Sequence, residues 1–462
     1  MVSLFSRRHG RLAWRPLPLR VLMASTAAAV AASLGLAAAL AVPTDTGADL
    51  LDAAAAGLSS IIMGASCVVL VVSLAIAAAS GVAALRATDA RRVRWQVCER
   101  LYSATRGNPL RLKDGDELPR VECRRDGGGF SVTVYTDSGD AESVSDIGSC
   151  ISAALHGRFE SFAVVSFEQD VAGKFVRFAV SDVSSDKSLR FSSVEEMRPE
   201  CPTRLAVQDG LYLDLTVARS WIVAGKTRAG KTTGVISLLI QVLLLGADDY
   251  GSKVVLIDPK SAELSQCGAV TLDEDGGAHS ILSEVRDFDR LRRERQSHLN
   301  ELSKERGDAV MWWDAGMKPC YLFIDEYVAL CSVLPKRRDK DDPGYSLDDF
   351  EGLVRTIATM GASAGCFLII SVAQASVGSG GISTVVLNAC GTHVLFRPTV
   401  DDGAFIWPRP LLDALPARRY APGDAWFSCD DGEHANPMFV RFPRMDFQVY
   451  AELKRLLDDY RS

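Results

Sequence analysis

The sequence lacks the cysteine and histidine patterns of a zinc site or a disulfide scaffold. Its eleven cysteines are scattered from Cys67 to Cys429 without a C-x-x-C pair, and its 462 residues include only six histidines. Structural zinc sites need such ligands at close and regular spacing. An odd and unpatterned cysteine count is typical of a reducing compartment. We therefore interpret the thiols as structural and expect no zinc site.

The sequence also lacks a strong net charge and an internal repeat. Lysine and arginine number 51 against 58 aspartates and glutamates, a net charge of −7, which argues against a wholly basic nucleic-acid binder. The length and the ordinary 48% hydrophobic content fit a globular chain of two or three domains. The net charge of the whole chain conceals a basic N-terminal segment. The first 20 residues contain no acidic residue but five arginines: Arg7, Arg8, Arg11, Arg15 and Arg20.

Charge is absent altogether from two long runs that follow this basic start. They are Val21–Val42 and Ala53–Leu85, and even the shorter would span about 33 Å as a helix, which is enough to cross a bilayer core. The segment between them, Pro43–Asp52, carries three acids and no base, whereas both outer flanks are basic. The positive-inside rule then predicts a multi-pass cell-membrane protein with its N-terminus and its main body in the cytoplasm. A cleaved signal peptide for the first run, or a pair of alanine-rich soluble helices, remains open.

A glycine-rich stretch, Gly225–Thr232, fits the pattern G-x-x-x-x-G-K-[ST] at every fixed position. The apolar run 220–224 before it is typical of a buried strand, and the apolar run 233–246 after it is typical of a helix. A strand, a glycine-rich turn and a helix together cradle a triphosphate with backbone N–H groups, although a surface loop could match the pattern by chance. The predicted nucleotide contacts are Gly225, Lys226, Thr227, Arg228, Ala229, Gly230, Lys231, Thr232 and Thr233.

A second apolar run, Tyr321–Ile324, ends in the two acids Asp325 and Glu326. In a nucleotide-hydrolysing site, the P-loop lysine, here Lys231, contacts the β- and γ-phosphates and is counted among the catalytic residues. The hydroxyl of Thr232 and the carboxylate of Asp325 are the expected Mg²⁺ ligands. Glu326 is the candidate general base that activates the attacking water. These assignments predict an ATPase that uses ATP and Mg²⁺.

Five apolar strand cores recur along the second half of the chain, with helical segments between most of them. They are Trp221–Ala224, Lys253–Ile257, Cys320–Ile324, Cys366–Ser371 and His393–Phe396. This alternation predicts an α/β fold with a largely parallel sheet covered on both faces. With the P-loop and the two acids, this part of the chain resembles a RecA-like P-loop ATPase domain. Upstream, residues 130–135, 161–167 and 175–180 read as strands and 145–156 as a helix of a small α+β module. The expected parts are residues 1–95 (membrane anchor with two transmembrane helices), 96–200 (middle module), 201–442 (motor) and 443–462 (helical tail).

Several of these motifs resemble the FtsK/SpoIIIE family of DNA translocases, over roughly residues 203–407. Ile257-Asp258-Pro259-Lys260 followed by Glu263-Leu264 is similar to a motif of that family, and 388–396 is similar to another. Ile369–Gln374 resembles the family's strand that ends in a sensor glutamine, which implies a catalytic role for Gln374. Two departures matter, because Ala362 stands where the family has arginine and Ala375 follows the glutamine. A trans-acting arginine is therefore open between Arg355 and Arg397, either of which could equally be an ordinary surface or ion-pairing residue.

Two anchor helices, a small module and one motor resemble, within that family, the TcpA-type conjugative coupling proteins. The resemblance implies a membrane-anchored homo-oligomeric ring, a hexamer, that translocates DNA, with relaxase and secretion-channel proteins as partners. Lys336-Arg337-Arg338 and Arg418-Arg419-Tyr420 are candidate DNA contacts, with a solvated loop as the simpler interpretation. An FtsK-like ATPase that exports proteins is the alternative, against which a single P-loop weighs. A non-enzymatic scaffold is a third, against which Glu326 beside Asp325 weighs.

Overall fold

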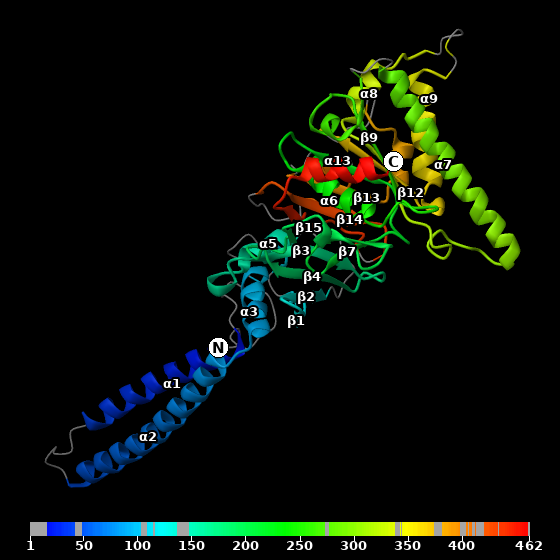
Figure 1. Ribbon diagram of the computed structural model, residues 1–462. Helices are drawn as coiled ribbons and strands as arrows, with labels where there is room; N and C mark the ends of the chain where they lie inside the picture. The colour runs from blue at the N-terminus through cyan, green and yellow to red at the C-terminus, as the bar shows by residue number, and fades with distance from the viewer. Residues whose placement is uncertain are drawn as a thin grey trace. The chain divides into compact units, whose positions relative to one another are not determined.

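The computed structural model describes the chain in two compact units, Met1–Val183 and Ser184–Ser462 (Figure 1). The description covers residues 16–41, 49–102, 109–113, 116–135, 147–272, 277–337, 342, 344–373, 381–397, 403–404, 406–408, 412, 420–432 and 434–460. Each unit is described by itself below.

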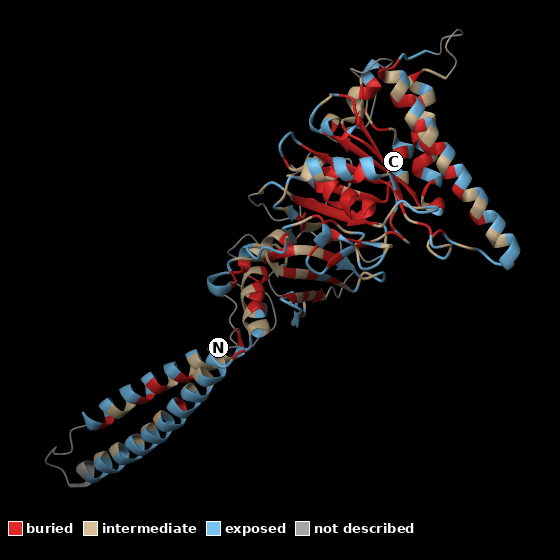
Figure 2. Ribbon diagram, viewed as in Figure 1, coloured by how far each residue is buried: buried red, intermediate tan, exposed pale blue. Residues whose placement is uncertain are grey.

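The first unit begins with two long apolar helices, α1 (Leu17–Leu40) and α2 (Asp49–Leu85). They pack side by side, and the Ser59 hydroxyl of α2 donates a hydrogen bond of 2.7 Å to the carbonyl oxygen of Ala39 in α1. Both are long and apolar enough to cross a membrane, by length and composition, and most of their residues are exposed (Figure 2). Since soluble core helices bury their apolar face, this exposure fits a lipid environment better than a protein core.

The rest of the first unit is a four-stranded antiparallel sheet in the order β1-β2-β4-β3. Helices α3 and α5 pack on each other and on the outer strands β1 and β3. The three predicted strands are confirmed as β2, β3 and β4, whereas β1 escaped prediction because four of its six residues are charged. The elements are α3 (Asp89–Leu101), β1 (Val121–Asp126), β2 (Gly129–Tyr135), α5 (Gly148–Ala154), η2 (Gly157–Phe159), β3 (Phe162–Gln169) and β4 (Phe175–Asp182).

The second unit is built on an eight-stranded sheet in the order β10-β9-β11-β12-β8-β13-β14-β15. The first six are parallel, as the alternation of strands and helices predicts, and β14 and β15 add an antiparallel edge. The strands are β8 (Trp221–Gly225), β9 (Lys253–Asp258), β10 (Val270–Thr271), β11 (Cys320–Ile324), β12 (Cys366–Val372), β13 (Thr392–Phe396), β14 (Asp424–Cys429) and β15 (Met438–Arg441). The five strands expected from the sequence in this part of the chain are β8, β9, β11, β12 and β13.

Helices cover both faces of this sheet. On one face lie α6 and α13 with the hairpin of β6 and β7, and on the other lie α7, α8, α9 and α10. The helices are α6 (Lys231–Leu243), α7 (Gly277–Arg306), α8 (Tyr327–Val333), α9 (Leu347–Met360), α10 (Thr384–Ala389) and α13 (Val449–Asp459), with short turns η3 (Glu195–Met197), η4 (Glu263–Cys267) and η5 (Ala362–Ala364). The short strands are β5 (Arg190–Phe191), β6 (Arg204–Gln208), β7 (Leu211–Asp214) and β16 (Arg444–Met445).

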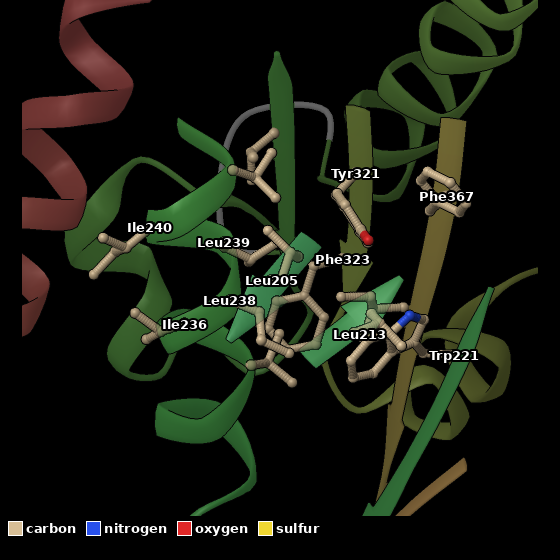
Figure 3. Close-up of a cluster of buried hydrophobic side chains, with 14 of the residues drawn as sticks. Leu205, Leu213, Trp221, Ile236, Leu238, Leu239, Ile240, Tyr321, Phe323 and Phe367 are labelled. Carbon is tan, nitrogen blue, oxygen red and sulfur yellow. The ribbon is translucent and has the colours of Figure 1, made fainter. Parts of the chain in front are cut away.

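The central strands are buried on both faces, so successive residues of one strand belong to two different cores. In β11, Tyr321 and Phe323 face the α6 side, whereas Leu322 and Ile324 face the α7 side. Figure 3 shows part of the α6-side core, where apolar residues of α6 and the β6–β7 hairpin lie near Trp221 and Phe323. A sheet held from both sides gives the loops at its carboxyl edge fixed starting points.

Candidate active site

The P-loop joins β8 to α6 and needs glycine at two of its positions. Gly225 has φ +150°, and a Cβ there would lie 2.6 Å from the carbonyl oxygen of Phe396 in β13. Gly230 has φ +99°, and a Cβ there would lie 2.6 Å from the backbone nitrogen of Gly423. Only glycine adopts such φ values without strain, and only the lack of a side chain permits these approaches. Strand β13 and the turn before β14 therefore leave room only for glycine at these two positions.

Lys231 is the first residue of α6 and is buried, although it is charged. Its ammonium donates a hydrogen bond of 2.7 Å to the carbonyl oxygen of Gly225, across the mouth of the loop. A buried charge needs such a partner, and this one holds the ammonium beside the α6 N-terminus, where anions bind favourably. Of the remaining predicted contacts, Lys226, Thr227, Arg228 and Thr233 are exposed, Gly230 and Thr232 are half-buried, and Gly225 and Ala229 are buried.

Asp325 follows β11 and lies at the same carboxyl edge of the sheet as the P-loop. Its residue is 8% exposed, and its backbone N–H donates to the carbonyl oxygen of Ile257 in β9. Burial raises the pKa of the Asp325 carboxyl above its ordinary value, and the charges of Glu326 and Asp258 raise it further. The Ser371 hydroxyl and the Lys231 ammonium oppose this shift. A buried carboxyl that is disfavoured as an anion is a suitable place for a cation.

Glu326 is held in an unusual backbone conformation immediately before α8. Its φ is +50°, in the left-handed region that non-glycine residues rarely occupy. Its backbone N–H donates to a carboxylate oxygen of Asp325 at 3.1 Å, and its own carboxylate lies 3.3 Å from the ammonium of Lys260. Its side chain is 17% exposed, so solvent still reaches it. Backbone strain of this kind persists where the surrounding structure demands one side-chain direction.

The remaining candidates from the sequence are the sensor glutamine and the basic residues, and the structure describes only some of them. Gln374 and three of the basic candidates, Arg338, Arg418 and Arg419, lie outside the described residues. Arg355 is exposed on α9, and Lys336 and Arg337 are exposed as well. Arg397 follows Phe396, which pairs with Gly225, so it lies beside the P-loop strand of its own chain.

Two residues of the site were not identified from the sequence. Ser371 faces Asp325 from the adjacent strand β12. Lys260 belongs to a motif that the sequence reveals, but the sequence does not predict its ion pair with Glu326. A serine in an apolar strand or a lysine in a loop does not by itself indicate a functional site. The order of the strands in the sheet brings Ser371 and Lys260 to Asp325 and Glu326.

The residues at this edge fit a magnesium–nucleotide complex. Mg²⁺ bound with phosphates usually takes only one or two protein ligands. Asp325 and Thr232 would supply one carboxylate and one hydroxyl to the ion, and Lys231 with the loop N–H groups would supply positive charge for the phosphates. Among the residues that the structure describes, no group of three or more metal-ligating side chains occurs, and this site does not require one.

No protein-family model matches the chain. It is similar to the FtsK domain-containing protein YdcQ of Bacillus subtilis strain 168, with 26% identity over 151 residues. That stretch is 32% of this chain and 28% of YdcQ, so the similarity covers less than two thirds of the relative.

Solved structures with a similar arrangement share little sequence identity. They include the pCW3 conjugation coupling protein TcpA in its monomer form with ATPγS (16% identity, TM-score 0.47, 74% of this chain and 93% of that one). ATPases 2 and 3 of EssC from Geobacillus thermodenitrificans show 14% identity and a TM-score of 0.41, over 60% of this chain and 52% of theirs. The cytoplasmic domain of the type VII secretion ATPase EccC from Thermomonospora curvata shows 15% identity and a TM-score of 0.40, over 58% and 33%. The similarity to YdcQ confirms that the chain resembles FtsK-domain proteins, as its motifs predict.

Proposed function

We propose that this protein is a membrane-anchored ATPase that translocates DNA as a coupling protein in conjugative transfer. The observation that carries the proposal is the meeting of Lys231 with Asp325 and Glu326 at one edge of a parallel sheet. It is supported by the FtsK-type motifs, by the similarity to YdcQ and by two exposed apolar helices ahead of the motor. The nucleotide in this proposal is ATP, whose hydrolysis would supply the energy for movement.

Each residue of the site has a distinct task in this proposal. Lys231 and the loop N–H groups bind and orient the β- and γ-phosphates. Thr232 and Asp325 would hold Mg²⁺, which when bound would neutralise developing phosphate charge. Glu326 accepts a proton from the attacking water, as a general base must. Gln374 would report the state of the γ-phosphate to the rest of the motor, as the family resemblance implies.

The motor acts as a homo-oligomeric ring, most simply a hexamer, with DNA in its central pore. DNA is gripped at its phosphates by a few basic residues, which agrees with the absence of an overall basic charge. Both ends of the chain and the motor lie in the cytoplasm, with α1 and α2 in the cell membrane. In this proposal the motor lies at the base of a secretion channel, and relaxase and channel proteins would be its partners, as the family resemblance implies.

Export of proteins is a second candidate function, and EccC, one of the solved structures compared above, is named as a type VII secretion ATPase. The two functions share the hydrolysis site and differ in what fills the pore. A DNA motor couples turnover to a polyanion, whereas a protein exporter has no reason to respond to one. The response of turnover to DNA therefore separates them.

The experiment is ATP turnover by the full-length chain reconstituted in lipid vesicles, without DNA, with single-stranded DNA and with duplex DNA. The Lys231→Ala variant, which should not hydrolyse ATP, is the blank for background turnover. We expect DNA of one form to stimulate turnover several-fold over the basal rate. Turnover that is measurable but indifferent to both DNA forms would favour protein export, and no turnover above the blank would contradict the ATPase assignment.

A further inference from the structure

The ion pair between Lys260 and Glu326 joins two motifs that are far apart in sequence. Their side-chain atoms Nζ and Oε1 lie 3.3 Å apart. The strands that precede them, β9 and β11, are neighbours in the sheet and pair through Ile257 and Ile324. The pair is thus a direct bridge between the loop after β9 and the candidate general base.

The loop that carries Lys260 is built to hold it in place. Asp258 is 1% exposed, and its two carboxylate oxygens accept hydrogen bonds from the backbone N–H groups of Lys260 (3.2 Å) and Ala262 (2.7 Å). Pro259 restricts the turn further, because its ring fixes φ. Ser261 in this turn has φ +51°, in the left-handed region that non-glycine residues rarely occupy. The backbone from Asp258 to Ala262 is therefore well defined, and it fixes the position of the Lys260 Cα.

Stability does not explain such a construction. The Lys260 side chain is 53% exposed, and an ion pair with one partner this exposed contributes little to the free energy of unfolding. The Glu326 side chain, in contrast, is 17% exposed and begins from a left-handed backbone. The ion pair thus joins Lys260, whose backbone is held in place, to Glu326, the carboxylate that must face the attacking water.

We propose that Lys260 is a positioning residue for the general base, a role that rests on the proposed ATPase function. Its ammonium binds Oε1 of Glu326 and leaves Oε2 to accept the proton of the attacking water. Without the ammonium, the carboxylate rotates among several orientations, and fewer of them face the water. Lys260 does not touch the nucleotide in this proposal, so it acts on turnover and not on nucleotide binding.

The test compares Lys260→Ala and Lys260→Arg with the wild type, in the full-length chain in lipid vesicles. Lys260→Ala should lower kcat about 10- to 100-fold, the loss typical of a misplaced catalytic group. KM and the dissociation constant of ATPγS should stay within about twofold, since binding is not involved. Lys260→Arg keeps a cation and should recover most of the rate. Lys253→Ala, an exposed lysine at the opposite end of β9, is the matched control and should behave as the wild type.

A double-mutant comparison distinguishes positioning from other roles. In a Glu326→Gln background there is no carboxylate to orient, so Lys260→Ala should change the residual single-turnover rate by less than about twofold. An equal loss in both backgrounds would overturn the proposal, as would an unchanged or raised kcat in Lys260→Ala alone. If the wild type itself shows no turnover above Lys231→Ala, the ATPase function fails, and the role of Lys260 fails with it.

Discussion

Replacing Gly230 by alanine should destabilise the second unit more than the same replacement at another glycine of similar conformation. Gly230 has φ +99°, and Gly307, at the end of α7, has φ +73°. A left-handed backbone costs a residue with a Cβ about 1–2 kcal/mol, so both variants should lose that much. Their effects on the unfolded chain are the same and cancel in the comparison. Only the surroundings of the new methyl group differ.

The surroundings predict the size of the difference. At Gly307 a Cβ meets no atom within 4 Å, whereas at Gly230 it would lie 2.6 Å from Gly423 N and 3.2 Å from Gly423 Cα. Those are backbone atoms of a loop bonded to the P-loop, because the Gly423 N–H donates to the carbonyl oxygen of Ala229. Forcing a methyl group into such a contact costs a further 1–3 kcal/mol, roughly. Gly230→Ala should therefore lose about 2–5 kcal/mol in total.

Urea unfolding of the full-length protein in detergent provides the measurement. Trp221, Trp312 and Trp426 are buried in the second unit, so their fluorescence follows its unfolding. The loss in free energy of unfolding is the shift in urea midpoint multiplied by the slope m. The slope m should be equal in the two variants. Equal destabilisation of both variants, or a greater loss at Gly307, would refute the reasoning that the P-loop is confined by its neighbouring loop.

Three further predictions concern the charged residues of the site. Lys231→Ala should lower kcat at least about 10²-fold, measured as phosphate release, because it removes the buried cation that faces the phosphates. Glu326→Gln should keep ATPγS affinity while turnover falls about 10²- to 10⁴-fold, and normal turnover would place the base elsewhere. Asp325→Asn should raise the nucleotide-free melting temperature at neutral pH, because the raised pKa of Asp325 makes its ionisation unfavourable to the folded state. That gain should disappear as the pH falls below the ordinary pKa of aspartate, where both states carry the proton; a gain that persists there would contradict the assignment.

The parallel core of the motor could be predicted because its strands are short, apolar and separated by helical segments. The antiparallel edge of β14 and β15 could not, because its pairing joins residues such as Phe396 and Ala425 across a long connection. The predicted P-loop helix, 233–246, in fact begins at Lys231 and ends at Leu243. Helix ends depend on caps and tertiary contacts more than on the apolar pattern.

Within the site, motifs identified residue types but not their partners. Lys231, Asp325 and Glu326 each follow a recognisable pattern, and their roles remain predictions. The contact of Lys260 with Glu326 depends on β9 lying next to β11, and the approach of Ser371 to Asp325 depends on β12 lying on the other side. Strand order is a property of the whole sheet, so no local pattern contains it.

The strand order also has a consequence for synthesis of the chain. Strand β8 carries the P-loop, yet its two neighbours are β12 and β13, and the hydrogen bond from Leu368 N–H to the Ser220 hydroxyl spans 148 residues. At translation rates of about 5–20 residues per second, roughly 7–30 s pass between the emergence of the two segments. During that interval an apolar strand waits without either neighbour, which exposes it to wrong pairing and makes folding slow. The P-loop is thus among the last parts of the second unit to reach its final geometry on the ribosome.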